Sequence, residues 1–178
     1  MTKMQRDYRK LVRFAAVSFD FLPCALTCKT YFARIVKSKK GLRKKGADMN
    51  YIVFDLEWNQ CPYGKEKENK KLPFEIIEIG AVKLDENRNI VDSFQEIIKP
   101  VVYHRLHFRT KEILGITSNR LEEGIPFKAA VKKFLEWCGT DVKFCTWGSA
   151  DLVELQRNLK YYRMLSLLKG PVFYYDVQ

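Results

Sequence analysis

The sequence predicts an α/β fold in which helices flank a mixed β-sheet. Three runs rich in β-forming residues follow one another between residues 51 and 99, with turn residues between them. After residue 108, segments with helical spacing alternate with short apolar runs. A meander of antiparallel strands followed by helix, strand, helix and strand gives a sheet with both antiparallel and parallel neighbours, whose apolar faces the helices cover.

The meander is the first part of this prediction, with strands over residues 51–58, 75–84 and 90–99. The first strand, YIVFDLEW, is apolar at most positions, which is typical of a strand buried on both faces. Residues 59–71 are polar and contain Pro62 and Gly64, so they are predicted to form a surface loop. Residues 85–89 form the second turn, and Pro100 closes the third strand.

The remaining elements alternate helix and strand. Helices are predicted over residues 109–114, from Pro126 to Gly139, and from Ser149 to about Tyr162. Strands are predicted over residues 142–147 and 172–177, the last after a break at Gly170-Pro171. Gly115 and Gly139 provide helix stops, and Ser149 can cap the helix that follows it. A last strand with nothing after it suggests a domain that lacks its C-terminal part.

Charge divides the chain into two parts. The net charge of +11 suggests a nucleic-acid partner, but residues 1–48 hold thirteen Lys and Arg against three Asp and Glu. Residues 49–178 hold nineteen against eighteen, so the predicted domain is nearly neutral. The partner of the domain must therefore be argued from its site.

We expect the basic segment 1–48 to lie outside the domain, which occupies residues 49–178. Its apolar run 14–28 follows a basic stretch as in a signal peptide, but Asp20 and Pro23 interrupt the run. The run is also too short to span a membrane. A start of the natural protein at Met49 is the favoured explanation, and a helical arm that contacts RNA or DNA is the alternative. A third hypothesis, which rests on residues 1–28 alone, is a secreted or membrane-anchored protein.

The cysteines favour a reducing, cytoplasmic location. Their number is odd, and they show neither a disulfide framework nor the spacing of a zinc site: Cys24, Cys28, Cys61, Cys138 and Cys145. Free cysteines in apolar surroundings behave as small hydrophobic residues.

Asp55 and Glu57 are the candidate centre of a functional site. They lie two residues apart in an apolar strand, so both side chains leave the same face of the sheet. Two carboxylates there repel each other and lose hydration. A divalent cation removes this conflict, because Mg²⁺ prefers hard oxygen ligands. An ion pair on an edge strand is the alternative, and the pair alone leaves both readings open.

Three further groups of residues bear on this site. Asp151 follows a short strand and begins a helix, where it either joins Asp55 and Glu57 or only complements the helix dipole. Asp176, in the last strand, could by its residue type be a fourth ligand. The only histidines, His104 and His107, are predicted to have no catalytic role.

Four segments, in order, resemble the DEDD superfamily of 3′-to-5′ exonucleases, the DnaQ-like and RNase T-like enzymes with the ribonuclease H-like fold. FDLEW at residues 54–58 resembles the first family motif, and EIIEIGAV at 75–82 resembles its second strand. LGIT at 114–117 resembles its T-G-I-T segment, and WGSAD at 147–151 resembles its second motif. The bacterial KapD-like sporulation-inhibitor branch is the most similar one.

The resemblance implies a role for each matched residue. Asp55, Glu57 and Asp151 would be catalytic and would hold two Mg²⁺ or Mn²⁺ ions about 4 Å apart, which stabilise the attacking and leaving oxygens. Leu56 and Trp58 would lie near the terminal nucleotide and bind the substrate, the 3′ end of RNA or single-stranded DNA. The resemblance gives no oligomeric state and no membrane association.

The sequence departs from the family at its third motif, H-x-x-x-x-D or Y-x-x-x-D, which supplies the general base and a fourth carboxylate. Neither pattern follows Asp151, and Asp176 resembles the D-V-Q strand that precedes the motif. The His-type subclass is therefore implied by the resemblance alone. We expect this chain to be nearly inactive, and the alternative is a non-catalytic module of the same fold that binds nucleic acid or a regulatory protein.

Overall fold

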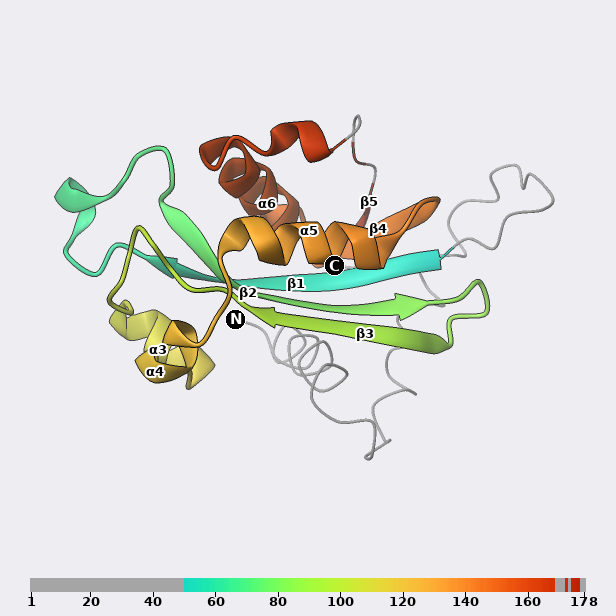
Figure 1. The fold of residues 1–178 in the computed structure, drawn as a ribbon, viewed down its shortest axis with the longest axis horizontal. Coiled ribbons are helices and arrows are strands. Elements are labelled where there is room, and N and C mark those ends of the chain that lie inside the picture. The colour runs from blue at the N-terminus through green and yellow to red at the C-terminus, as the bar shows by residue number, and fades with distance from the viewer. Residues whose placement is uncertain (1–49, 169–171, 173, 177–178) are drawn as a thin grey trace.

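The computed structural model describes residues 50–168, 172 and 174–176 (Figure 1). The predictions for residues 1–48 and for the break at Gly170-Pro171 lie outside this range. No helix in the described part of the chain is long and apolar enough to cross a membrane.

A five-stranded mixed sheet forms the centre of the molecule, as the sequence predicts. Its strands are β1 (Asn50–Gln60), β2 (Phe74–Leu84), β3 (Ile90–Ile97), β4 (Val142–Thr146) and β5 (Tyr174–Asp176). They lie in the order β3-β2-β1-β4-β5. The meander β1, β2 and β3 is antiparallel, whereas β4 lies parallel to β1 and β5 parallel to β4.

The helices are α3 (Phe108–Leu114), α4 (Ser118–Glu122), α5 (Phe127–Cys138) and α6 (Ala150–Tyr161), with 3-10 turns η1 (Lys65–Lys67) and η2 (Leu165–Leu167). The short helix α4 was not expected. It holds five mostly polar residues, too few to show a helical period, and begins where the Thr117 hydroxyl accepts a hydrogen bond from the Arg120 amide.

Two strand ends differ from the sequence prediction by two residues, and one predicted helix cap is not formed. β1 continues to Gln60, into residues expected to form the loop, and β3 ends at Ile97 instead of residue 99. Ser149 occupies the position before α6, but its side chain makes no capping hydrogen bond. The first turn of α6 instead carries Asp151, whose carboxylate is used elsewhere.

One face of the sheet carries the main core. Ile52, Phe54 and Leu56 of β1 lie in one cluster with the apolar faces of α5 and α6, including Phe134 and Leu159. Figure 1 shows α5 and α6 on this side of the sheet. Burial of apolar surface of this kind contributes roughly 25 cal/mol per Å².

The opposite face holds smaller clusters. Val53 of β1 packs with Val82, Leu84 and Cys145 in a second cluster. At the far end of the sheet, Ile77 packs with three residues of the segment that carries α3 and α4, namely Leu106, Ile116 and Leu121. Residues alternate along β1 between the two faces, and this alternation decides where Asp55 and Glu57 point.

The segment with α3 and α4 leaves the sheet and returns to the same point. The Ile125 amide donates to the Ile97 carbonyl and the Lys99 amide to the Ile125 carbonyl, each at 3.0 Å. Gly124 makes this approach possible, because a Cβ there would lie 2.8 Å from the Lys99 nitrogen and 2.9 Å from the Ile97 oxygen. Figure 1 shows the segment beyond the ends of β1 and β3.

Candidate active site

β1 places Asp55 and Glu57 on one face of the sheet. Their neighbours Phe54 and Leu56 lie in the main core, so the two carboxylates point to the opposite face. Both side chains are buried, with exposed fractions of 6% and 7%. Buried carboxylates need compensating charge or hydrogen bonds, which makes this pair the natural starting point for a site.

Asp151 reaches the same strand from α6. Pairing between β1 and β4 ends at Val53 and Cys145, so past that point the edge of β1 has no strand beside it. There the Leu56 amide donates to Asp151 Oδ1 at 3.0 Å. Leu56 lies between Asp55 and Glu57, so the third carboxylate, itself only 4% exposed, is fixed beside the other two.

A fourth buried carboxylate lies across the sheet. Glu57 is directly opposite Glu78 of β2, so both side chains leave the same face. Gln95 of β3 donates through Nε2 to Glu78 Oε1 at 2.7 Å, which satisfies one oxygen of that group. Like charges directly opposite each other are unfavourable, so this face of the sheet favours a cation.

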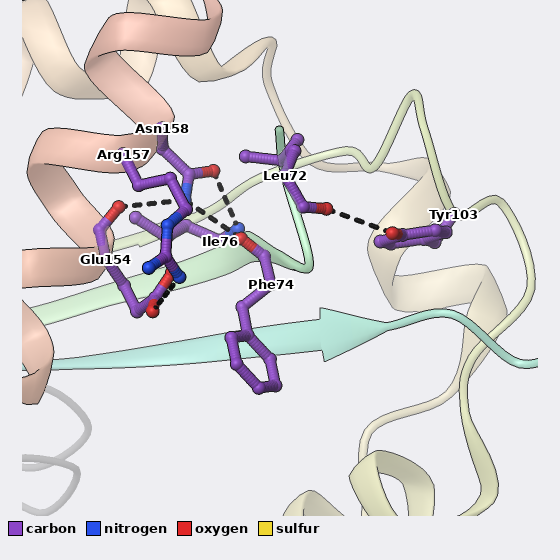
Figure 2. A network of polar contacts seen from close by, with 7 residues as sticks. All are labelled: Leu72, Phe74, Ile76, Tyr103, Glu154, Arg157 and Asn158. Atoms are coloured by element: carbon purple, nitrogen blue, oxygen red, sulfur yellow. Dashed lines mark hydrogen bonds and ion pairs between the residues drawn. The ribbon is translucent and has the colours of Figure 1, made fainter. Parts of the chain in front are cut away.

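Asn158 holds α6, and with it Asp151, against the sheet (Figure 2). Its Nδ2 donates to the Phe74 and Glu154 carbonyls at 2.9 Å, and its Oδ1 accepts from the Ile76 amide at 3.1 Å. Asn158 is completely buried. It lies seven residues after Asp151, two helical turns along the same face of α6. The hydrogen bonds of Asn158 to β2 therefore fix the position of Asp151 along β1.

Glu75 ties the start of β2 to the loop after β3 and to the end of α6. Its carboxylate accepts from the backbone amides of residues 101, 102 and 103, and from the hydroxyl of Tyr162 at 3.1 Å. Burial raises the pKa of Tyr162, and the negative charge of Glu75 raises it further, so this hydroxyl remains a donor. Glu75 therefore has a structural role.

Asn59 anchors the next part of that loop to β1. Its Nδ2 donates to the Tyr103 carbonyl at 2.9 Å and to the Arg105 carbonyl at 3.0 Å, while its Oδ1 accepts from the His107 amide at 2.9 Å. Asn59 is completely buried and points to the same face as Glu57. The loop and the carboxylates therefore share one face of the sheet.

Comparison with known proteins gives this arrangement a family. The RNase T family model, whose description is Exonuclease, matches residues 52–166. The chain belongs to this exonuclease family. The match extends from β1 into the 3-10 turn η2 and includes Asp55, Glu57 and Asp151.

Two curated exonucleases are similar in sequence. The probable 3′-5′ exonuclease KapD of Bacillus subtilis is 29% identical over 122 residues, which cover 68% of this chain and 58% of that protein. The mouse 3′-5′ exoribonuclease 1 is 34% identical over 149 residues, which cover 77% of this chain and 41% of that protein. The chain therefore spans less than two thirds of the length of either relative.

Solved exonuclease structures share the ribonuclease H-like fold. The nuclease domain of 3′hExo, a DEDDh family member bound to rAMP, superposes with a TM-score of 0.55 at 25% identity, over 65% of this chain and 60% of that one. Cell-death related nuclease 4 gives a TM-score of 0.54 at 23% identity, over 68% of this chain and 42% of that one, and this likeness concerns the fold alone. The mixed sheet predicted from the sequence is thus the exonuclease sheet.

Leu56 and Trp58, the predicted nucleotide contacts, lie on the core side of β1. Leu56 is completely buried in the main core. Trp58 is partly buried against the same core, with its ring 6.0 Å from that of Phe74. The backbone of Leu56 contacts Asp151, and substrate binding by the two side chains stays a prediction.

Asp176 and His107 have structural contacts. Asp176 Oδ1 accepts from the Gly148 amide at 2.9 Å and so holds the turn between β4 and α6. His107 Nδ1 accepts from the Arg109 amide at 3.3 Å at the start of α3 and lies 3.2 Å from Gln60 Nε2. The fourth-ligand role of Asp176 and the lack of a catalytic role for His107 stay predictions.

The three carboxylates are of a type that suits a hard divalent cation. Asp55, Glu57 and Asp151 offer carboxylate oxygens, which Mg²⁺ and Mn²⁺ prefer. Within residues 50–168, no group of three or more His, Cys, Asp and Glu side chains forms a set that could hold a metal ion. The three carboxylates match the cation in chemistry but do not close around one ion on their own, so their role as ligands stays a prediction.

Proposed function

We propose that this chain is a metal-dependent 3′-to-5′ exonuclease that acts on the ends of RNA or single-stranded DNA. The observation that carries the proposal is the hydrogen bond from the Leu56 amide to Asp151 Oδ1, which joins the two motifs at one strand. The KapD-like branch and the His-type subclass are part of the proposal, supported by the bacterial and DEDDh relatives.

Asp55, Glu57 and Asp151 would hold the metal in this mechanism. Two bound Mg²⁺ or Mn²⁺ ions would supply an activated water and stabilise the leaving oxygen. The protein contributes rigidity, since β1 fixes two carboxylates and α6 fixes the third through Asn158. Catalysis requires that the groups that bind the metal and the substrate are held in fixed positions.

The near-neutral charge of residues 49–178 favours a short or single-stranded end as substrate. A long duplex presents one charge per ~1.7 Å of axis, and its binding depends on many Lys and Arg contacts. The names of the relatives include an exoribonuclease, which supports RNA as one substrate.

Degradation of a 5′-labelled single-stranded oligonucleotide in the presence of Mn²⁺ tests the proposal. We expect a ladder of products shortened from the 3′ end, because two bound ions would activate a water and stabilise the leaving oxygen. Asp55→Asn should abolish the ladder, whereas Asp141→Asn, at an exposed loop position with φ of 55°, should leave it unchanged.

Calorimetric titration with Mn²⁺ separates the enzyme from the alternative. We expect Asp55→Asn to weaken Mn²⁺ binding while Asp141→Asn does not. A chain that binds oligonucleotide but shows neither Asp55-dependent Mn²⁺ binding nor a ladder would contradict the proposal. It would support the non-catalytic nucleic-acid-binding module instead.

A further inference from the structure

An exposed aromatic side chain stands at the start of α3, in the segment that Asn59 anchors to β1. Phe108, the first residue of α3, is 67% exposed, the largest fraction among the exposed large hydrophobic residues in the described part of the chain. The His107 ring lies against it, with centroids 4.6 Å apart and planes at 36°. The Arg109 guanidinium lies 5.8 Å from the centre of the same ring.

The segment around Phe108 is strongly basic in a domain that is nearly neutral. Residues 99–111 contain four Lys and Arg, two His and no Asp or Glu. Arg105, Arg109 and Lys111 are exposed, and none of them forms an ion pair with another residue of the described ranges. Cations interleaved with an exposed aromatic ring match the chemistry of a single strand, with phosphates for the cations and a base for the ring.

The backbone under Phe108 is fixed to the strand that carries the carboxylates. Asn59 makes three buried hydrogen bonds to residues 103, 105 and 107, and the Thr110 hydroxyl donates to the Trp58 carbonyl at 3.4 Å. Asn59 lies two residues beyond Glu57 on the same face, about 7 Å along the strand. An exposed ring on so well-anchored a loop needs little ordering when a ligand binds.

Resting on the proposed function, we propose that Phe108 stacks on an unpaired base of the substrate strand, and that Arg105 and Arg109 contact its phosphates. The strand would run from its 3′ end at Asp55 and Glu57 along this face to α3. The segment would then recognise unpaired nucleotides that precede the 3′-terminal nucleotide. Stacking on one ring tolerates any base, so the contact would select strandedness and length but not sequence.

Affinity measured by fluorescence anisotropy tests this contact. The full chain is titrated, in buffer with EDTA to prevent turnover, against labelled single-stranded oligonucleotides of about three and about ten nucleotides and against a duplex. We expect Phe108→Ala to weaken binding of the longer strand by about tenfold, the size typical of one lost base stack. Phe108→Trp should restore the affinity. The duplex should bind the wild-type chain and Phe108→Ala equally.

Ile113→Ala is the matched control, because Ile113 is another exposed apolar residue of α3 and should have no effect. Equal affinities of the wild-type chain and Phe108→Ala for the longer strand would overturn the inference and favour a protein-docking role for the ring. Asp55-dependent trimming with Phe108-independent binding would overturn this inference alone. Phe108-dependent binding without any trimming would overturn the proposed function and leave the inference standing.

Discussion

At the scale of single residues, Asp151 combines two tasks that a substitution can separate. Its Oδ1 satisfies the buried amide of Leu56, and its negative charge is the part that a cation would need. An aspartate in a first helical turn often serves only the helix dipole, so the contact with β1 is what distinguishes this one.

We predict that Asp151→Ala lowers the free energy of unfolding by about 1–3 kcal/mol, because a buried amide loses its acceptor. Asp151→Asn should cost less than about 1 kcal/mol, because its amide oxygen can accept the same bond. Both should lose Mn²⁺ affinity equally. Urea denaturation measures the change in stability, and calorimetric titration measures the loss of Mn²⁺ affinity. Equal destabilisation by both variants would show that the hydrogen bond from the Leu56 amide does not stabilise the fold.

Glu154 provides a pH-dependent prediction. Burial raises the pKa of Glu154, and Arg157 opposes this only in part. Oε1 pairs with Arg157, whereas Oε2 is buried without a hydrogen-bond partner in the described residues. Below its ordinary pKa the carboxyl is protonated in both states, and stability is lost as the pH rises through the raised value.

We therefore expect Glu154→Gln to gain stability relative to the wild-type chain as the pH rises from about 4 to about 7. Urea denaturation at several pH values measures the difference in unfolding free energy. Glu136→Gln, at an exposed position of α5, should show no such trend. A difference that is constant with pH would show that burial of Glu154 has no energetic consequence.

At the scale of elements, the position of α6 depends on one side chain. Asn158 lies on the apolar face of the helix with Leu155 and Leu159, yet it uses both its oxygen and its nitrogen on β2 and on α6 itself (Figure 2). Two turns upstream, the same face carries Asp151. Stability and site geometry are thus linked through this helix.

We predict that Asn158→Ala costs about 2–3 kcal/mol, because two buried backbone groups of β2 lose their partner. Exchange of the Leu56 amide with solvent should also become faster, since its bond to Asp151 depends on the height of α6. Gln156→Ala, at an exposed position of the same helix, is the control and should leave the Leu56 amide protected. Unchanged exchange in Asn158→Ala would show that Asp151 is held independently.

The strength of the sequence patterns explains which elements could be predicted. The strands β1, β2 and β4 and the helices α5 and α6 have long apolar patterns or clear stops, and they appear within one or two residues of the expected places. Helix α4 and the 3-10 turn η2 are too short to show a period. Of the strand expected over residues 172–177, the described residues Tyr174–Asp176 pair with β4.

The site could be predicted in part for the same reason. Asp55 and Glu57 stand out because carboxylates are rare in an apolar strand. Asn59, Glu75 and Asn158 were missed, although each interrupts an apolar stretch, because only the fold shows which distant backbone each one satisfies. A buried polar residue in an apolar pattern is the signal that could have found them.

At the scale of the whole molecule, charge is distributed unevenly over a nearly neutral domain. The carboxylate face is acidic, and the segment that holds Arg105, Arg109 and Lys111 next to it is basic. Regions of opposite charge side by side can orient a nucleic acid strand. Its terminal phosphate would lie at the carboxylate face together with bound metal ions, and its upstream phosphates would lie at the basic segment.

We predict that replacing Arg105 and Arg109 by Gln reduces the slope of log Kd against log salt concentration by about 1.4, because each of the two proposed phosphate contacts of a single strand contributes about 0.7. Titrations of one oligonucleotide at several KCl concentrations measure the slope. The comparison is between variants of the same chain, so the basic residues 1–48 contribute equally to both. An unchanged slope would place the phosphate contacts elsewhere.

The crossing at Gly124 closes the segment between Lys99 and Ile125 into a loop, since its two ends are bonded to each other and to β3. Its buried contacts with Asn59 and Glu75 fix the backbone, so its exposed residues can change without moving the sheet that carries Asp55 and Glu57. Sequence change at these exposed positions can therefore alter contacts with a ligand independently of the carboxylate site. Exchange of the exposed residues between proteins of this fold should change ligand preference while leaving Asp55, Glu57 and Asp151 in place.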